Sequence, residues 1–276
     1  MIPKIIHYCW FGGNPLPELA QRCIASWRKF LPDYEIWQWV EVPLHENEDE
    51  AKKTNPNENS LYDKRLFFDV NMIPYTAEAY RLGKYAFVSD YARFWILYKY
   101  GGLYFDTDVE VIRPMDDIIE QGCFMGCESD AEKGATLSVA PGLGLGVNPG
   151  LGLGVNPGLG LIKKILAYYE SAVFDFKPDI RSMTTVVHIT TEILKKNGLE
   201  EISGIQKVDG VYIYPREYFC PINVITGKMH ITSNTRTVHH YSGSWIGDKF
   251  SIKDKIKSFL PEWFVLFLIR AKSLRK

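Results

Sequence analysis

Residues 85–108 read Tyr85-Ala-Phe-Val-Ser-Asp-Tyr-Ala-Arg-Phe-Trp-Ile-Leu-Tyr-Lys-Tyr-Gly-Gly-Leu-Tyr-Phe-Asp-Thr-Asp108, an apolar run that ends in two aspartates one residue apart. If residues 103–105 form a buried strand, Asp106 and Asp108 leave its end on the same side, roughly 6.6 Å apart at about 3.3 Å per residue. Two carboxylates at that spacing can share one hard cation. Ligand sites in open α/β sheets lie at the carboxyl ends of strands, so the pattern predicts a divalent-metal site here.

The residues before this strand favour a helix. Ser89 or Asp90 can cap a helix that runs to about residue 100, and Gly101 can end it in a left-handed conformation. Asp90 and Arg93 then lie on one face of the helix. Taken alone, they could form an ordinary surface ion pair, but their place just before the aspartates favours a role in the same site.

Three blocks of the sequence resemble a known family. The run Ser89-Asp-Tyr-Ala-Arg93, followed by Leu97-Tyr-Lys-Tyr-Gly-Gly-Leu-Tyr-Phe-Asp-Thr-Asp108, is similar to the sugar-binding region of DXD-containing glycosyltransferases. This group includes bacterial capsular polysaccharide transferases, yeast-type initiating mannosyltransferases and the catalytic domain of glucosylating toxins. The other two blocks, in matching order, are Ile2-Pro-Lys-Ile-Ile-His-Tyr-Cys-Trp-Phe-Gly-Gly13 and Tyr214-Pro-Arg-Glu-Tyr-Phe-Cys-Pro221 with His239-His-Tyr-Ser-Gly-Ser-Trp245.

The resemblance implies an α/β fold of the GT-A type, with a mixed central sheet flanked by helices, and retaining transfer of a sugar from a nucleotide-diphospho-sugar. It also implies roles for individual residues. Trp10 would stack on the base of the donor. Asp90 and Arg93 would hold the transferred sugar and the diphosphate. Asp106 would reach the ribose and the metal, and Asp108 would bind the metal.

The closing block would cover the diphosphate with His239, His240, Ser244 and Trp245, and His240 would be a further metal ligand. Adjacent side chains on a strand point in opposite directions, so at most one of the two histidines is expected to reach the site. In the toxin relatives this block reads serine-x-tryptophan, whereas here Ser244 is adjacent to Trp245.

The resemblance therefore implies a hexosyltransferase that uses Mn²⁺ or Mg²⁺ and a nucleotide-sugar donor, with UDP-sugars favoured. The expected acceptor is an oligosaccharide, in some cases lipid-linked, in surface polysaccharide or capsule synthesis. Two other classes stay open. A glycoside hydrolase could use Asp106 and Asp108 as its paired carboxylates, and a non-catalytic carbohydrate-binding protein would also be rich in aromatic residues. The sequence identifies neither the donor sugar nor the acceptor.

Composition narrows the class of protein. The formal net charge is −1, which argues against nucleic-acid binding, and 46% hydrophobic residues suffice for a large core. Five cysteines and no charged-then-apolar leader predict a reduced, cytoplasmic protein. Cys123 and Cys127 are expected to be buried apolar residues. No run reaches the roughly 18 apolar residues of a membrane span.

Hydrophobic periodicity predicts the secondary structure, with a βαβ unit at the start and a loop at residues 46–60. The expected strands are residues 4–10, 34–39, 109–112, 123–127 and 135–139. The expected helices are residues 18–30, 61–70 and 77–82, the one that begins at Ser89, and one that begins at Leu161.

Two segments stand apart from this pattern. Residues 143–150, Leu-Gly-Leu-Gly-Val-Asn-Pro-Gly, recur unchanged as residues 151–158, which we interpret as a duplicated Asn-Pro-Gly turn inserted before the helix at Leu161. Residues 249–276 carry eight basic and two acidic residues around a short apolar run. We expect a transferase domain at residues 1–248 and a basic amphipathic tail at residues 249–276 that places the protein peripherally on an anionic membrane.

Overall fold

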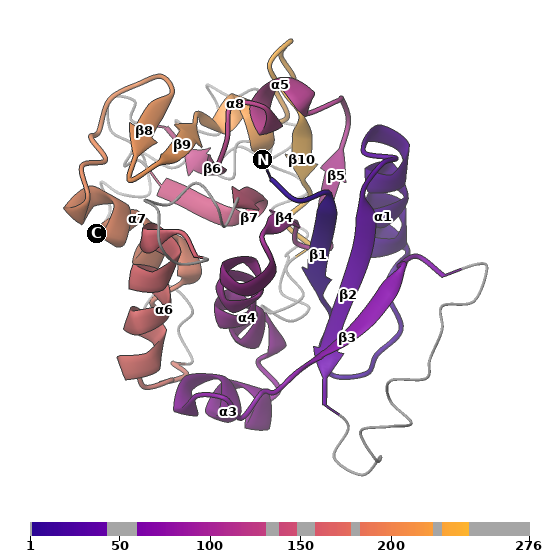
Figure 1. Cartoon of the computed structure of the whole chain (residues 1–276), viewed down its shortest axis with the longest axis vertical. Helices are drawn as coiled ribbons and strands as arrows, with labels where there is room; N and C mark the ends of the chain where they lie inside the picture. The colour runs from indigo at the N-terminus through magenta and orange to yellow at the C-terminus, as the bar shows by residue number, and fades with distance from the viewer. Residues whose placement is uncertain are drawn as a thin grey trace, which may run out of the picture.

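An eight-stranded sheet and a two-stranded ribbon organise the chain (Figure 1). The structure is a computed structural model and describes residues 2–42, 60–130, 138–147, 158–177, 183–222 and 228–242. Its strands are β1 Ile5–Cys9, β2 Glu35–Glu41, β3 Lys64–Phe68, β4 Gly102–Tyr104, β5 Val109–Val111, β6 Phe124–Ser129, β7 Ser138–Val147, β8 Gln206–Val208, β9 Val211–Tyr214 and β10 Thr237–His239. Its helices are α1 Glu18–Phe30, α3 Pro74–Arg81, α4 Tyr85–Tyr100, α5 Asp116–Ile119, α6 Gly160–Ser171, α7 Val186–Lys196 and α8 Arg216–Phe219.

The large sheet has the strand order β3-β2-β1-β4-β7-β6-β9-β8. β1 pairs in parallel with β2 and β4, and β2 pairs in parallel with β3. β7 is antiparallel to both of its neighbours, β4 and β6, so β6 runs in the same direction as β4. β9 is parallel to β6. The carboxyl ends of β1, β2, β3, β4, β6 and β9 therefore share one edge of a mixed sheet.

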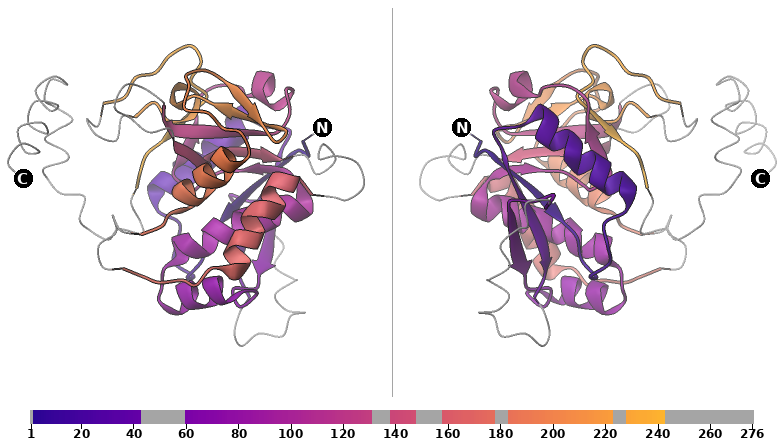
Figure 2. Two further views of the ribbon diagram at one scale, coloured as in Figure 1. Left: turned by 90° about the vertical axis from the view of Figure 1, so that its left-hand side faces the viewer. Right: turned by 90° about the vertical axis from the view of Figure 1, so that its right-hand side faces the viewer.

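Helices cover both faces of this sheet. Figure 2 shows α6 and α7 toward the viewer in its left-hand view and α1 in its right-hand view. One buried cluster joins the sheet to α3, α4, α6 and α7, and a second joins it to α1, α8 and the β5–β10 ribbon. The expected α/β fold with a mixed central sheet flanked by helices is confirmed.

Helix α4 lies in the middle of this arrangement and leads directly into the strand before the two aspartates. Nine of its residues are buried, which explains why the sequence shows no clear apolar stripe. The helix begins at Tyr85, four residues earlier than predicted, and Ser89 is an interior residue whose Oγ donates to the Tyr85 carbonyl at 3.2 Å. It ends as predicted at Gly101, whose φ is 68°.

Several predicted elements are confirmed with small shifts in their ends, and residues 18–30 form α1 as predicted. Residues 61–70 do not form a helix. Lys64–Phe68 instead pairs with Trp37–Glu41 as the parallel edge strand β3. Cys123 and Cys127 are buried, as predicted.

The repeat lies partly within β7. The first five residues of its first copy, Leu143 to Val147, form the end of that strand, and the predicted Asn-Pro-Gly turn follows them. Residues 148–157 and the tail at 249–276 lie outside the described residues.

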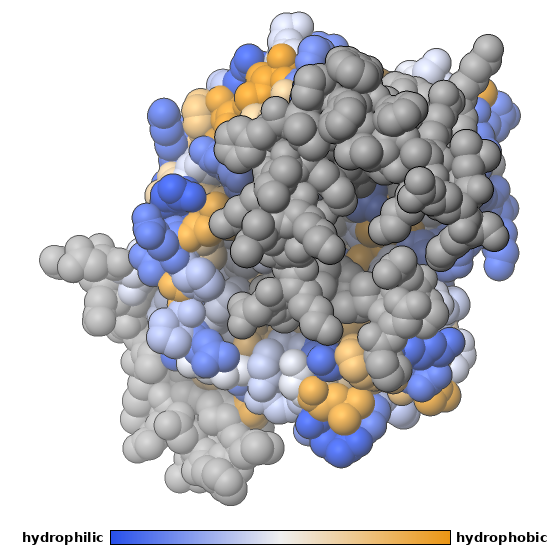
Figure 3. All heavy atoms as spheres, turned by 180° about the vertical axis from the view of Figure 1, so that it is seen from behind, coloured by the Kyte–Doolittle hydropathy of each residue, from blue (hydrophilic) through white to orange (hydrophobic). Residues whose placement is uncertain are grey.

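The described surface is mixed in character. On the face opposite to the one seen in Figure 1, hydrophilic side chains alternate with small apolar patches (Figure 3). Among the described helices, none combines the length and hydrophobicity needed to cross a bilayer.

Candidate active site

The predicted site residues gather at the carboxyl edge of the parallel strands. Trp10 directly follows β1, and Asp106 follows β4 by two residues. The register places His7 beside Tyr104, so β1 and β4 reach this edge together. The edge is where an α/β sheet binds ligands, because the loops there diverge to leave space.

A buried cation organises one half of the site. The Arg93 guanidinium lies 2.9 Å from Asp90 Oδ1 and 3.3 Å from both carboxylate oxygens of Asp106. Arg93 Nε donates to the Ser89 carbonyl at 3.0 Å. Arg93 Cζ lies over the Tyr104 ring, 5.0 Å from the centre of that ring. Arg93 therefore links α4 to the residues that follow β4, as the i, i+3 spacing of Asp90 and Arg93 predicted.

Burial sets the charge of this group. It raises the pKa of Asp90, an effect that the nearby Arg93 cation partly offsets. Burial alone would lower the pKa of Arg93, but Asp106, Tyr104 and Asp90 together raise it, so the guanidinium stays charged. Its side chain is only 4% exposed, whereas that of Asp106 is 30% exposed. Asp106 is thus the most exposed side chain of the three.

The second half of the site is built around Asp108 by the β5–β10 ribbon. Asp108 Oδ2 accepts hydrogen bonds from Ser242 N at 2.8 Å and Ser242 Oγ at 2.9 Å. Its Oδ1 lies 3.2 Å from Nε2 of His239. The main-chain oxygen of Asp108 accepts from His240 N at 3.0 Å. These bonds fix the carboxylate at the start of the ribbon.

The pairing also fixes the charges of the two side chains. Burial alone would raise the pKa of Asp108, but His239 and Ser242 bring it well below its usual range. Burial alone would lower the pKa of His239, but its hydrogen bonds to Asp108 and Cys220 and the carboxylates of Asp108 and Asp106 raise it to about 10. At neutral pH the site therefore holds an imidazolium beside an ionised Asp108.

The two histidines face different carboxylates, consistent with the alternation of a strand. His240 was the expected ligand, but its Nε2 lies 2.8 Å from Oε2 of Glu110, and the histidine at Asp108 is His239. The antiparallel pairing of His239 with Val109 produces this arrangement. Ser244 and Trp245 lie outside the described residues.

The donor types fit a hard divalent cation. Asp106 and Asp108 offer carboxylate oxygens, the ligands that Mn²⁺ and Mg²⁺ prefer. In the described part of the chain, no three His, Cys, Asp or Glu side chains are grouped as a metal site. Binding would therefore require the carboxylates to exchange some of the hydrogen bonds that they make to Arg93, His239 and Ser242.

Trp10 lies at the same edge with its ring only partly buried. Its Nε1 donates to the Asn14 carbonyl at 2.6 Å, and its backbone N donates to the Trp39 carbonyl at 2.8 Å. Two residues on, Gly12 has a φ of 91°, and a Cβ there would lie 2.2 Å from the Tyr85 ring. The glycine lets the chain turn closely over α4 while Trp10 stays at the edge.

Sequence reasoning missed two residues that touch the aspartates. Tyr104 Oη donates to Asp106 Oδ1 at 3.3 Å, and Ser242 holds Asp108. The alternation of the strand could have identified Tyr104, because it lies two residues before Asp106 and faces the same way. Ser242 becomes a neighbour only through the pairing of β5 with β10.

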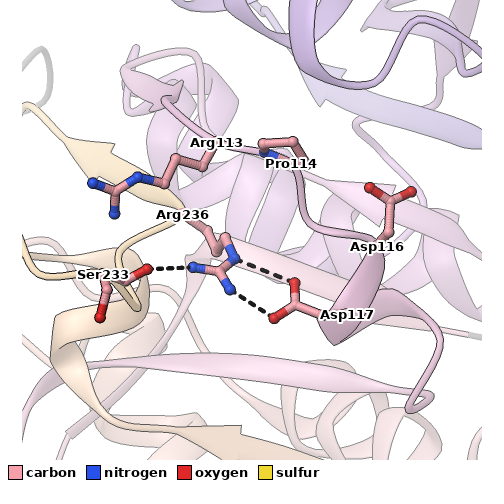
Figure 4. A pocket seen from close by; sticks show the side chains of 6 residues that line it. All are labelled: Arg113, Pro114, Asp116, Asp117, Ser233 and Arg236. Atoms are coloured by element: carbon pink, nitrogen blue, oxygen red, sulfur yellow. Dashed lines mark hydrogen bonds and ion pairs between the residues drawn. The ribbon is translucent and has the colours of Figure 1, made fainter.

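The far end of the ribbon is anchored separately. Figure 4 shows the Arg236 guanidinium between Asp117 on α5 and Ser233. It makes hydrogen bonds of 2.6 and 3.3 Å to Asp117 and one of 3.0 Å to the Ser233 carbonyl. Arg113 donates to the carbonyl oxygens of Thr232 and Thr235. This surface pocket is thus lined by groups that fasten the ribbon to the domain.

Known proteins resemble the chain in sequence and in fold. Residues 17–125 match the family described as glycosyltransferase sugar-binding region containing DXD motif. Inositol phosphoceramide mannosyltransferase 1 of Schizosaccharomyces pombe is 31% identical over 124 residues, which cover 45% of this chain and 33% of that protein. The chain thus matches about a third of the length of this relative.

Two solved structures are similar at lower identity. PaToxG glycosyltransferase is 19% identical with a TM-score of 0.45, over 71% of this chain and 69% of that one. The glycosyltransferase GlyE of Streptococcus pneumoniae is 13% identical with a TM-score of 0.48, over 99% of this chain and 64% of that one.

The matched residues include Asp90, Arg93, Asp106 and Asp108, whereas His239 and Ser242 lie beyond them. Residues 17–125 of this chain are thus similar to the sugar-binding region of DXD-containing glycosyltransferases.

Proposed function

We propose that this protein transfers a hexose from a nucleotide-diphospho-sugar, with a UDP-sugar as the favoured donor, to a hydroxyl group of a glycan with retention of configuration. One observation supports this most strongly. Asp90, Arg93, Asp106 and Asp108 converge at the carboxyl edge of the sheet, inside the region that matches the family. A nucleotide diphosphate is the ligand that this combination of carboxylates and cations suits.

Asp106 and Asp108 would hold Mn²⁺ or Mg²⁺, which when bound neutralises charge on the leaving diphosphate. The protein adds its own positive charges at the same place. Arg93 keeps its charge while buried and orients the Asp106 carboxylate. His239 lies beside Asp108 as an imidazolium. Cations that are already fixed in place stabilise developing negative charge without reorganisation.

The remaining residues position the donor. Trp10 would stack on the base, and the buried Asp90 carboxylate, held by Arg93, would accept hydrogen bonds from hydroxyl groups of the sugar. Transfer would proceed on one face of the sugar. The bond from C1 to the diphosphate oxygen breaks with its electron pair on the diphosphate, the acceptor oxygen bonds to C1, and the acceptor proton passes to the departing diphosphate.

The acceptor we propose is an oligosaccharide of surface polysaccharide or capsule synthesis, lipid-linked where the tail meets a membrane. The sugars of such glycans are assembled from nucleotide-sugar donors. This part of the proposal rests on the resemblance of the sequence and on the basic tail at residues 249–276.

The test is release of nucleotide diphosphate from a panel of nucleotide sugars with Mn²⁺, with and without a chelator. We expect release by the wild type, loss of release in Asp108→Asn or with the chelator, and restoration by Mn²⁺ only in the wild type. Asp33→Asn, at a 73% exposed aspartate paired with Lys4, is the matched control and should behave as the wild type.

Any other outcome would contradict part of this proposal or indicate another class of protein. Release that ignores the chelator would remove the metal from the proposal. Cleavage of simple glycosides without a nucleotide would indicate a hydrolase. Sugar binding without turnover would indicate a binding protein. Unfolding of Asp108→Asn, seen by circular dichroism, would make its hydrogen bonds to Ser242 and His239 structural.

A further inference from the structure

Glu128, near the end of β6, lies level with the two aspartates. Leu145 of β7 pairs with Tyr104 on one side and with Met125 on the other, so these two residues stand at the same height in the sheet. Asp106 and Asp108 come two and four residues after Tyr104, and Glu128 comes three residues after Met125. β6 lies two strand spacings from β4, or roughly 9.5 Å. β7 fills that interval within the sheet, so a sugar ring attached to a diphosphate at the aspartates would have to reach Glu128 across β7.

The backbone at Glu128 departs from regular pairing. Cys127 pairs with Val139 and Ser129 pairs with Ser138, so β6 has one more residue than β7 over this step, and Glu128 is that extra residue. It therefore occupies a β-bulge. Bulges are enriched beside active sites, where they redirect a side chain away from the ladder.

In the part of the chain that the structure describes, no other residue holds this side chain in place. Within the described residues, the Glu128 carboxylate forms no hydrogen bond or ion pair, although it is half-buried. A partly buried carboxylate without a partner costs free energy, because it loses hydration and gains no hydrogen bond. Glu128 thus differs from Asp106 and Asp108, whose carboxylates are held by Arg93 and by Ser242.

The surroundings of Glu128 connect it to the site. Burial raises its pKa, and the charge of His239 opposes that shift, so the same imidazolium that contacts Asp108 also acts on Glu128. The Glu128 charge in turn helps to raise the pKa of Tyr241, whose ring centre lies 4.1 Å from that of His239 with the two rings tilted by 48°. Whether ionised or protonated, a carboxyl group can hydrogen-bond to a hydroxyl.

We propose that Glu128 is a specificity-determining residue whose carboxylate accepts a hydrogen bond from a hydroxyl group of the donor sugar. This inference rests on the proposed function, because the sugar must be attached to a nucleotide diphosphate held at Asp106 and Asp108. Glu128 lies after residue 125, outside the part of the chain that matches the family. Its position follows from the register of β6 against β7 and from the bulge between them.

The experiment compares binding of nucleotide sugars with binding of the bare nucleotide. Affinities for UDP-glucose, UDP-galactose, UDP-N-acetylglucosamine and GDP-mannose, and for UDP and GDP, are measured by calorimetry with Mn²⁺ in the wild type, Glu128→Ala and Glu128→Gln. Glu120→Gln, at an exposed position after α5, is the control. We expect Glu128→Ala to weaken binding of the preferred nucleotide sugar about tenfold or more, the ratio expected for a lost hydrogen bond to a charged group, while binding of the bare nucleotide is unchanged.

Glu128→Gln keeps the shape of the side chain and an oxygen that can accept a hydrogen bond. Its affinity for the nucleotide sugar should therefore fall less than that of Glu128→Ala. An equal loss for the sugar and the bare nucleotide would overturn the proposal, since the effect would then be structural. Unchanged binding of every nucleotide sugar by Glu128→Ala would overturn it as well. If the wild type binds none of the six compounds, the proposed function fails together with this inference. This result differs from the others because it is seen in the wild type and not only in the variants.

Discussion

Trp10 is a partly buried aromatic residue at the carboxyl edge of the sheet, and only part of its ring packs against the core. Its ring packs partly against the α1 side of the core, and its Nε1 hydrogen bond to Asn14 is local. We predict that Trp10→Ala weakens nucleotide-sugar binding by about 1–3 kcal/mol, the range for losing a base–aromatic stack. Calorimetry with the nucleotide sugar and with the free nucleotide measures the effect.

Trp10→Phe retains an aromatic face and serves as the control, so it should recover most of the affinity. The free energy of unfolding of both variants should stay near that of the wild type. If donor affinity is the same in Trp10→Ala, the residue belongs to the core and the base binds elsewhere.

At this scale the sequence predicts contacts that are local and misses those that depend on pairing. Asp90 and Arg93 meet because they are three residues apart on a helix, and that much is visible in the sequence. The choice of His239 over His240 depends on the register of β10 against β5. The bulge at Glu128 was not predicted either, because a bulge is a property of two strands and not of one.

Gly102 controls how closely β4 approaches β1, and β4 positions Asp106. Its φ is 94°, and a Cβ there would lie 2.6 Å from the Ile5 carbonyl oxygen and 3.2 Å from Nε2 of His7. We predict that Gly102→Ala lowers the free energy of unfolding by about 1–3 kcal/mol beyond the cost of the backbone conformation. It should also reduce turnover, because β4 must move away from β1. Urea denaturation and the nucleotide-release assay give the two values.

Gly83→Ala is the matched control, because Gly83 also has a positive φ, 66°, but has nothing within 4 Å of the added Cβ. The difference between the two losses in the free energy of unfolding therefore measures the effect of the contact with Ile5, separately from the backbone strain. Equal losses in both would mean that β1 and β4 are not packed as closely as described.

The elements that the sequence mispredicted are those whose neighbours define them. Lys64–Phe68 is short, and its sequence pattern fits a helix as well as a strand. It forms a strand because it pairs with the edge of β2. The glycines at positions 144 and 146 weaken a strand pattern, yet Leu145 to Val147 pair with β4, and Leu145 and Gly146 also pair with β6. By contrast, α1 is amphipathic with an acidic first turn and a basic last turn, and its bounds were predicted correctly.

The stability of the whole molecule should depend on pH through His7. This residue is fully buried in β1, with Nε2 bonded to the Gly101 carbonyl at 2.9 Å and Nδ1 accepting from Trp39 Nε1 at 3.1 Å. Burial lowers its pKa to about 3, against the smaller opposing effect of the hydrogen bond to Gly101. Below the unfolded pKa of about 6.5, the unfolded chain therefore binds a proton that the folded chain does not.

We predict that this contribution to stability is present above pH 6.5 and is lost as the pH falls toward 3, at about 1.4 kcal/mol per pH unit. In His7→Gln, which can keep both hydrogen bonds, the free energy of unfolding should fall less steeply over this range. Urea denaturation at several pH values measures both slopes. His188→Gln, on the exposed side of α7, is the control. Identical slopes in the wild type and His7→Gln would show that His7 does not titrate with unfolding.

The last prediction concerns the tail at residues 249–276, which lies outside the described residues. Its eight basic and two acidic residues surround the run Trp263-Phe-Val-Leu-Phe-Leu-Ile269, which is too short to span a bilayer. A short apolar run with tryptophan at one end and basic residues beyond it is typical of an interfacial helix. Each basic residue near an anionic surface contributes about 1 kcal/mol.

We therefore predict that the full chain co-sediments with anionic vesicles in low salt, and that a truncation after Lys257 does not. Neutral vesicles are the control, and binding to the anionic ones should weaken as salt is added, because the attraction is screened over about 10 Å at 0.1 M. The truncated protein should still release nucleotide diphosphate in solution, because the site residues described above all precede residue 243. Equal sedimentation of the two proteins would exclude the tail as the anchor and leave docking on the domain as its role.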